Sequence, residues 1–166
     1  FPYPPPSMLL IAPMGWFEME TAFPLWQMIH MGFLAAAVWL MARQFLPGDG
    51  LLGLGMAVLL TAALQPTIDN VYTGQTNFLV LLLFLLYWRD RDRPRAGLWL
   101  LLASFVKPFM AALLLYVVAR RQWPVVRGLL VAGLAACAAS IVVFGWDIFI
   151  SYFTDSPLSN YGTYRL

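Results

Sequence analysis

Uncharged apolar segments follow one another along this chain, separated by short loops that carry most of its arginines. The longest, residues 22–42, has 21 residues without a charge, and about 20 apolar residues in a helix cross the ~30 Å hydrocarbon core of a bilayer. Only 11% of the residues are charged, against about 25% in soluble domains. The sequence therefore predicts an all-α fold, a polytopic transmembrane helical bundle that forms a single domain over residues 1–166.

The other apolar segments are short, and their lengths predict paired short spans and an interfacial helix. They are residues 51–64, 78–88, 96–106, 109–119 and 128–144. Residues 7–17 would form a helix of about 16 Å, which is too short to cross the core, so we expect it to lie at the membrane surface. Short spans occur where neighbouring helices shield them or where they line a water-filled cleft.

The positions of the basic residues predict the orientation of the helices. Eight of the ten fall in or beside the loops 43–50, 89–95 and 120–127, and the positive-inside rule puts such loops on the cytoplasmic side of the cell membrane. Residues 65–77 and both ends of the chain then lie outside. Residues 96–119 form a hairpin of two short helices with its tip pointing outward, and the alternative is one span of 24 residues.

Lys107 is the only lysine of the chain, and Pro108 follows it directly in an otherwise apolar stretch. A charge at the centre of a membrane helix costs about 2.5–3.5 kcal/mol, and proline cannot continue the helical hydrogen-bond ladder. A cation at such a break indicates a functional site, and an ammonium group suits a phosphate oxygen. The alternative is a lysine that reaches the lipid headgroups from the tip of the hairpin.

Amide, carboxylate and hydroxyl side chains are concentrated in residues 65–77, which we expect to form an outer loop. Gln75 and Asn77 are sugar-binding candidates, because an amide both donates and accepts hydrogen bonds. Asp69 is a candidate for accepting a sugar hydroxyl or for binding a divalent cation, the one cofactor considered. The alternative is that Gln75, Asn77 and the threonine between them cap the next helix, with Gly74 supplying a turn.

Four further residues each have a functional interpretation and a simpler structural one. Glu18 and Glu20 are carboxylates near the predicted outer face, and a solvated helix end accounts for both. His30 lies in the first full-length span, where an ionisable residue indicates function, although packing through a hydrogen bond to a neighbouring helix explains it too. Cys137 is alone, so neither a disulfide framework nor a metal-binding spacing is expected. No nucleic-acid partner is expected.

Seven short motifs occur along the chain in a fixed order. They are Tyr3-Pro4-Pro5, Pro66, Gly74-Gln75-x-Asn77, Ala96-Gly97, Lys107-Pro108, Arg120-Arg121-x-Trp123 and Phe144-Gly145. This order resembles the middle of glycosyltransferase family 87, the polytopic mannosyltransferase-like enzymes of the GT-C superfamily, and the resemblance covers nearly the whole chain.

The resemblance implies a bundle of GT-C type that moves a hexose, mannose, from a polyprenyl-phosphate carrier to a lipid or glycan acceptor on the outer face of the membrane. It adds Tyr3 to the sugar-binding candidates and gives Lys107 a phosphate to bind. It also implies a catalytic carboxylate in the first outer loop, a region that would lie before Phe1. No catalytic residue is therefore assigned. The chain is expected to be an inactive internal fragment, without the first helix, the first outer loop and a C-terminal part.

A transporter or flippase for a lipid-linked or anionic solute is the alternative function. Broken helices and an embedded cation suit transport as well. Against it, the sequence contains no inverted repeat, and its polar groups collect on one predicted face rather than at the midplane.

Overall fold

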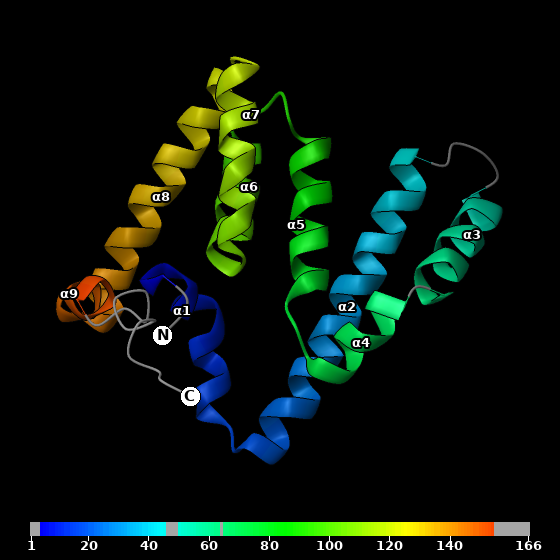
Figure 1. The fold of residues 1–166 in the computed structure, drawn as a ribbon, viewed down its shortest axis with the longest axis horizontal. Helices are drawn as coiled ribbons and strands as arrows, with labels where there is room; N and C mark the ends of the chain where they lie inside the picture. The colour runs from blue at the N-terminus through cyan, green and yellow to red at the C-terminus, as the bar shows by residue number, and fades with distance from the viewer. Residues whose placement is uncertain (1–3, 46–49, 64, 155–166) are drawn as a thin grey trace, which may run out of the picture.

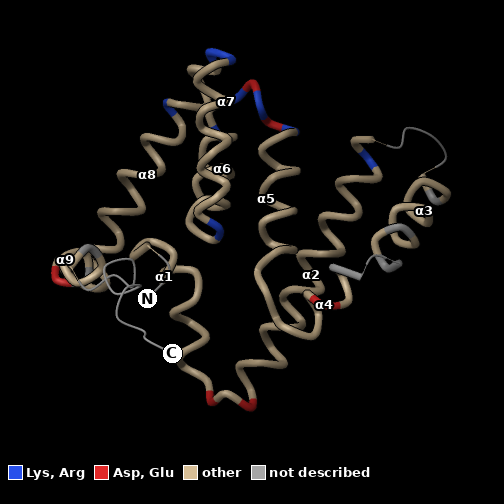
Figure 2. Tube along the Cα trace, in the orientation of Figure 1, with Lys and Arg blue, Asp and Glu red and all other residues tan. Residues whose placement is uncertain are grey.

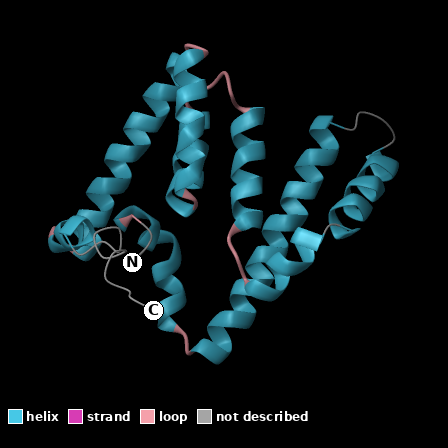
Figure 3. Cartoon of the chain, in the orientation of Figure 1, coloured by secondary structure: helices cyan, strands magenta, loops and turns pink. Residues whose placement is uncertain are grey.

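The computed structural model describes residues 4–45, 50–63 and 65–154, and over these ranges the chain is helical, with no strand (Figures 1 and 3). The predicted all-α fold is confirmed. The α-helices (α) and 3-10 helices (η) are, in order, α1 (Pro5–Ile11), η1 (Ala12–Trp16), α2 (Met19–Phe45), α3 (Gly50–Ala63), α4 (Gln65–Thr73), α5 (Asn77–Arg89), α6 (Arg95–Val106), η2 (Pro108–Ala112), α7 (Leu113–Ala119), α8 (Trp123–Phe144) and α9 (Asp147–Thr154).

Two of these helices, α2 and α8, are long and apolar enough to cross a membrane. The segments Asn77–Arg89, Arg95–Val106 and Pro108–Ala119 are shorter apolar helices. Together with the low charge content, these helices identify an all-α membrane protein. The short helices α1 and η1 lie where a short interfacial helix is predicted.

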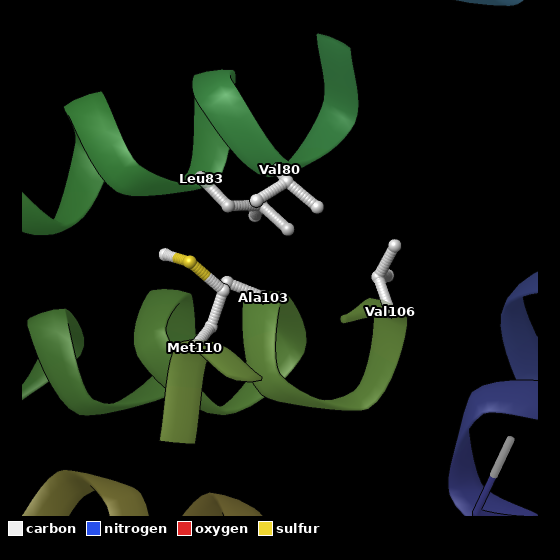
Figure 4. Close-up of a cluster of buried hydrophobic side chains, with 5 residues drawn as sticks. All are labelled: Val80, Leu83, Ala103, Val106 and Met110. Atoms are coloured by element: carbon white, nitrogen blue, oxygen red, sulfur yellow. The ribbon is translucent and has the colours of Figure 1, made fainter. Parts of the chain in front are cut away.

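Apolar side chains from α5, the α6–α7 region and α8 form the centre of the bundle. In Figure 4, two residues of α5 face two of α6 and one of η2; the cluster is Val80, Leu83, Ala103, Val106 and Met110. A second cluster continues along the same helices and adds α8; it is Tyr87, Ala96, Leu100, Val117 and Val125. These contacts hold α5, α6 and α8 side by side (Figure 1).

Helix α6 and helix α8 approach each other closely at two glycines. A Cβ atom on Gly97 would overlap the backbone of Leu129 and the carbonyl oxygen of Val125, and one on Gly128 would overlap the carbonyl group of Pro94. The missing side chains therefore let the two backbones touch, as small residues do where membrane helices cross.

The predicted hairpin over residues 96–119 is confirmed, and the single continuous span is wrong. Helix α6 ends at Lys107, whose backbone is extended with φ −137° and ψ 102°, and Pro108 starts η2 in the opposite direction. Near this break Met110 packs on Val106, while at the far end Val117 packs on Ala96. The two halves are therefore antiparallel.

Two segments expected outside the helices are helical. Residues 65–73 form α4 rather than a loop, since Pro66 falls in the first turn, where proline is tolerated, and Gly74 ends the helix with φ +64°. Past Gly145, residues 147–154 form α9. Both helices are short, and neither has the long apolar run by which the other segments were recognised.

Most basic residues lie at one end of the bundle (Figure 2). Helix α2 runs parallel to α5, because Trp26 contacts Gly74 at the start of α5 and Leu40 packs on Leu85 near its end. Their C-terminal ends therefore share one side with the start of α6 and the end of the hairpin. This arrangement agrees with the predicted grouping of the arginine loops, whose cytoplasmic location stays a prediction. Of the loop 43–50, residues 46–49 lie outside the described ranges.

Candidate functional site

A cavity of about 180 Å³ lies at the opposite end of the bundle, between α1, α2, α5 and α6. Its walls are almost wholly apolar and include Leu10, Trp26, Phe33, Leu79 and Leu102. Three motifs that are far apart in the sequence meet there. They contribute Ser7 after the proline run, Thr76 within Gly74-Gln75-x-Asn77, and Val106 directly before Lys107.

The proline run orients Ser7 at the start of α1. Pro4 is extended and Pro5 and Pro6 occupy the first turn, where a missing N–H group leaves no hydrogen bond unmade. Ser7 is buried, and its hydroxyl donates a hydrogen bond of 2.6 Å to the carbonyl oxygen of Pro4. Tyr3, the sugar-binding candidate of the same motif, lies outside the described residues.

Helix α2 fixes the turn between α4 and α5 through two side chains. The Nε1 atom of Trp26 donates to the carbonyl oxygen of Gly74 at 2.9 Å, and the Nε2 atom of Gln27 donates to the carbonyl oxygen of Val71 at 2.6 Å. Since Gly74 adopts the left-handed conformation, its role in a turn is confirmed. These two hydrogen bonds hold the turn against α2, and Thr76, two residues after Gly74, lines the cavity there.

Gln75 and Asn77 do not face the cavity. Both are exposed, and the Nδ2 atom of Asn77 donates to the Oε1 atom of Gln75 at 3.2 Å. Thr76 occupies the N-cap position of α5, but within the described part of the chain its side chain makes no capping hydrogen bond. The capping alternative is therefore wrong for Thr76, and sugar binding by Gln75 and Asn77 stays a prediction.

Asp69 lies on the exposed side of α4, where its main-chain oxygen accepts a 2.8 Å hydrogen bond from the Thr73 hydroxyl. It does not line the cavity. Over the described ranges, no three His, Cys, Asp or Glu side chains gather in a way that would hold a metal ion. Glu18 and Glu20 are exposed at the beginning of α2.

Lys107 directly follows Val106, a residue of the cavity wall, at the break between α6 and η2. Its N–H donates to the carbonyl oxygen of Ala103 at 2.8 Å, and its own carbonyl oxygen accepts from Met110 at 2.9 Å. The side chain is half-buried, and no carboxylate of the described residues forms an ion pair with it. An ammonium group without a carboxylate counter-ion, on the residue next to the wall of an apolar cavity, is suited to an anionic group on an apolar ligand.

Three polar side chains from α2, α4 and the turn before α5 have buried atoms without a partner among the described residues, and of these the sequence pattern singled out only His30. His30 and Asn70 are 1% and 3% exposed, and neither has a hydrogen-bond partner among the described residues. The hydroxyl of Thr76 is also buried without such a partner. His30 was expected to bond to a neighbouring helix, and that expectation is wrong. Asn70 and Thr76 carried no separate signal within a uniformly polar segment.

Asp90, at the other end of the bundle, belongs to a local network and not to the cavity. The loop around it was interpreted as solvated, yet Asp90 is only 2% exposed. It accepts hydrogen bonds from Arg95 Nη2 at 2.6 Å and from Trp99 Nε1 at 3.0 Å, and it pairs with Arg89. Burial alone raises the pKa of this carboxyl group, but the hydrogen bonds from Arg89, Arg95 and Trp99 outweigh it and lower the pKa from 3.8 to about 2.

Comparison with known proteins supplies the family. No curated protein and no solved structure matches the chain. The model of glycosyltransferase family 87 matches residues 1–162, a range that contains the proline run, the α4–α5 turn and the Lys107-Pro108 break. The chain therefore belongs to glycosyltransferase family 87, as its ordered motifs predicted, and has the helices of a membrane glycosyltransferase.

Proposed function

We propose that this glycosyltransferase moves a hexose, mannose, from a polyprenyl-phosphate carrier to a lipid or glycan acceptor on the outer face of the cell membrane. One observation carries the choice of donor. Half-buried Lys107 directly follows Val106, a residue in the wall of the apolar cavity of about 180 Å³. An isoprenoid phosphate has the matching chemistry, a long apolar chain that ends in an anion.

The apolar walls of the cavity are proposed to bind the first isoprene units of the donor. Apolar surface removed from water contributes about 25 cal/mol per Å², and Trp26, Phe33 and Leu79 offer such surface on α2 and α5. A sugar nucleotide, whose base and ribose are polar, would leave these walls without a partner. The cavity therefore favours a lipid-linked donor.

Lys107 is proposed to stabilise the leaving group. The acceptor hydroxyl oxygen attacks the anomeric carbon, the bond between that carbon and the phosphate oxygen breaks, and the phosphate leaves with the electron pair. A carboxylate takes the hydroxyl proton. Because negative charge grows on the phosphate as the bond breaks, a fixed cation beside it lowers the barrier.

The polar side chains around the α4–α5 turn are proposed to bind the parts of the substrates that project from the cavity. Gln75 and Asn77 are exposed and offer amide donors and acceptors to sugar hydroxyl groups. Asp69 is a further hydroxyl acceptor or a ligand for a divalent cation. Tyr3 completes the set of sugar-binding candidates.

The test is transfer of radiolabelled mannose by the full-length protein in detergent. Polyprenyl-phosphate-mannose is the donor, and a membrane lipid extract supplies the acceptor. We expect labelled product from the wild type and a loss of about 10²-fold or more in Lys107→Ala, since removing one stabiliser of transition-state charge costs about that much. Arg91→Ala is the matched control, because Arg91 is an exposed cation in the loop between α5 and α6, away from the cavity.

The outcome also separates the transferase from the alternative function. Product formed equally by wild type and Lys107→Ala would remove Lys107 from the mechanism. Absence of transfer to any acceptor, together with polyprenyl-phosphate binding that depends on Lys107, would favour a transporter or flippase for a lipid-linked solute.

A further inference from the structure

Three polar side chains with buried, unpartnered atoms come from the junction where α2 contacts α4 and the turn before α5. They are His30, Asn70 and Thr76, and between them five nitrogen and oxygen atoms have no hydrogen-bond partner among the residues that the structure describes. Buried polar atoms in proteins are nearly always hydrogen-bonded, because an unmet one loses its contact with water and gains nothing in return. Several such unpartnered atoms in one region indicate that a ligand supplies their hydrogen bonds.

The contacts of α2 bring these three side chains to the same junction. The His30 ring packs against Trp26, with ring centroids 4.3 Å apart, and against Phe78 at 6.3 Å. Phe78 follows Thr76 by two residues. Asn70 directly precedes Val71, whose carbonyl oxygen accepts the 2.6 Å hydrogen bond from α2.

The junction adjoins the cavity beside Lys107. Trp26 and Phe33, the two rings that flank His30 along α2, both line that cavity, and so does Thr76. Val106, directly before Lys107, lines the cavity as well. Thr76 itself lines the cavity, and the His30 ring packs between two rings that line it, so a ligand in the cavity lies next to this junction.

Other buried or half-buried hydroxyl groups of the helices are satisfied locally. Ser104, Ser140 and Thr61 each donate to the carbonyl oxygen one turn earlier, at 2.7–2.8 Å. Thr76 precedes α5 and lacks such a bond to a described residue. The unmet atoms are thus specific to this junction and are not a general property of the bundle.

We propose that His30, Asn70 and Thr76 bind hydroxyl groups of the sugar carried by the lipid phosphate. This inference rests on the proposed donor. A neutral imidazole has one donor and one acceptor, and the amide and the hydroxyl group offer both as well. A partner for this set both donates and accepts hydrogen bonds, as sugar hydroxyl groups do. Since the sugar is joined directly to the phosphate, it can reach the junction while the phosphate stays at Lys107.

The test compares two ligands on the full-length protein in detergent, polyprenyl phosphate and polyprenyl-phosphate-mannose. The first reports contacts of the phosphate and the isoprenoid chain, and the difference between the two reports contacts of the sugar. We expect Thr76→Val and Asn70→Leu each to weaken binding of the mannose-bearing ligand by about tenfold. Their affinity for polyprenyl phosphate should not change.

Two further variants make the comparison specific. Thr61→Val is the same substitution on α3, where the hydroxyl already bonds to the Ala57 carbonyl oxygen and does not line the cavity, so it should keep the preference for the mannose-bearing ligand. His30→Phe should lose that preference. Without ligand, Thr76→Val should melt at the wild-type temperature or above it, because replacing an unmet polar group by an apolar one of the same shape removes a cost.

The possible failures are distinct. If the three variants prefer the mannose-bearing ligand as strongly as the wild type does, bound water alone satisfies these atoms and the sugar site is overturned, while the proposed donor stands. If the wild type binds both ligands equally, the sugar site is likewise overturned. If the wild type binds neither ligand, the proposed donor is wrong, and the sugar site falls with it.

Discussion

At the scale of single residues, Asp90 shows how the fold distinguishes two side chains that the sequence makes equivalent. Asp90 and Asp92 both lie between arginines in residues 89–93. Only Asp90 is buried, because the turn into α6 brings Arg95 and Trp99 against it. The run of alternating charges predicted a solvated loop, and no local pattern indicated which carboxylate the indole of Trp99 would reach.

The lowered pKa of Asp90 predicts a pH-dependent stability. The folded-state pKa of about 2 lies below the ordinary value of 3.8, so the stabilisation is present above about pH 4 and is lost as the pH falls through 2. The difference corresponds to roughly 2 kcal/mol at neutral pH. We expect Asp90→Asn to lower the melting temperature in detergent at pH 7, with a difference from wild type that shrinks between pH 4 and pH 2.

Asp92→Asn is the matched control, since Asp92 is exposed in the same loop. It should melt as the wild type does at both pH values. Equal pH dependence of melting in wild type and Asp90→Asn would show that the network around Asp90 contributes nothing to stability.

At the scale of helices, the crossing of α6 and α8 depends on the absence of two side chains. Overpacking a close contact costs about 1–3 kcal/mol, and the atoms in the way at Gly97 and Gly128 belong to the backbone. We therefore expect Gly97→Ala and Gly128→Ala to lower the free energy of unfolding by at least that amount, measured as a lower melting temperature in detergent.

Gly133→Ala, on the same helix α8, separates packing from helix propensity. A Cβ atom there would meet only methyl groups of Leu101, at 3.9–4.0 Å, an ordinary contact. Because alanine favours a helix over glycine by up to about 1 kcal/mol, this variant should melt at or above the wild-type temperature. A rise in melting temperature for all three variants would show that α6 and α8 do not touch at these glycines.

The helices that the sequence predicted and those that it missed differ in one physical respect. Residues 96–106 and 78–88 were predicted to within a residue of α6 and α5, because charged loops and prolines end a long apolar run sharply. Helix α4 was predicted as a loop, since nine polar and mixed residues carry no such run and its helical form depends on contacts with α2. The cavity was predicted only in part. The sequence identified the motifs that contribute to its wall, but the burial of His30 and Asn70 follows from the packing of α2 against α4, which no local pattern indicates.

At the scale of the whole molecule, the parallel pairing of α2 with α5 and the reversal at Lys107 put most arginines at one end of the bundle (Figure 2). The cavity lies at the other end, between α1, α2, α5 and α6. The positive-inside rule then predicts that the cavity opens toward the outer face. This can be tested in cells with single cysteines and a membrane-impermeant maleimide, after Cys137→Ala removes the native thiol. Glu20→Cys should be labelled from outside, and Asp92→Cys only after the membrane is permeabilised.

The orientation also decides between classes of donor. Lipid-linked sugars can serve a site that faces outward, whereas soluble sugar nucleotides are confined to the cytoplasm. Labelling of Asp92→Cys from outside, with protection of Glu20→Cys, would put Lys107 and the cavity near the cytoplasmic face, where a sugar nucleotide can also serve as donor. Labelling in the predicted order leaves an outward-facing apolar cavity with a cation beside it, for which a membrane-bound phosphate is the available anion.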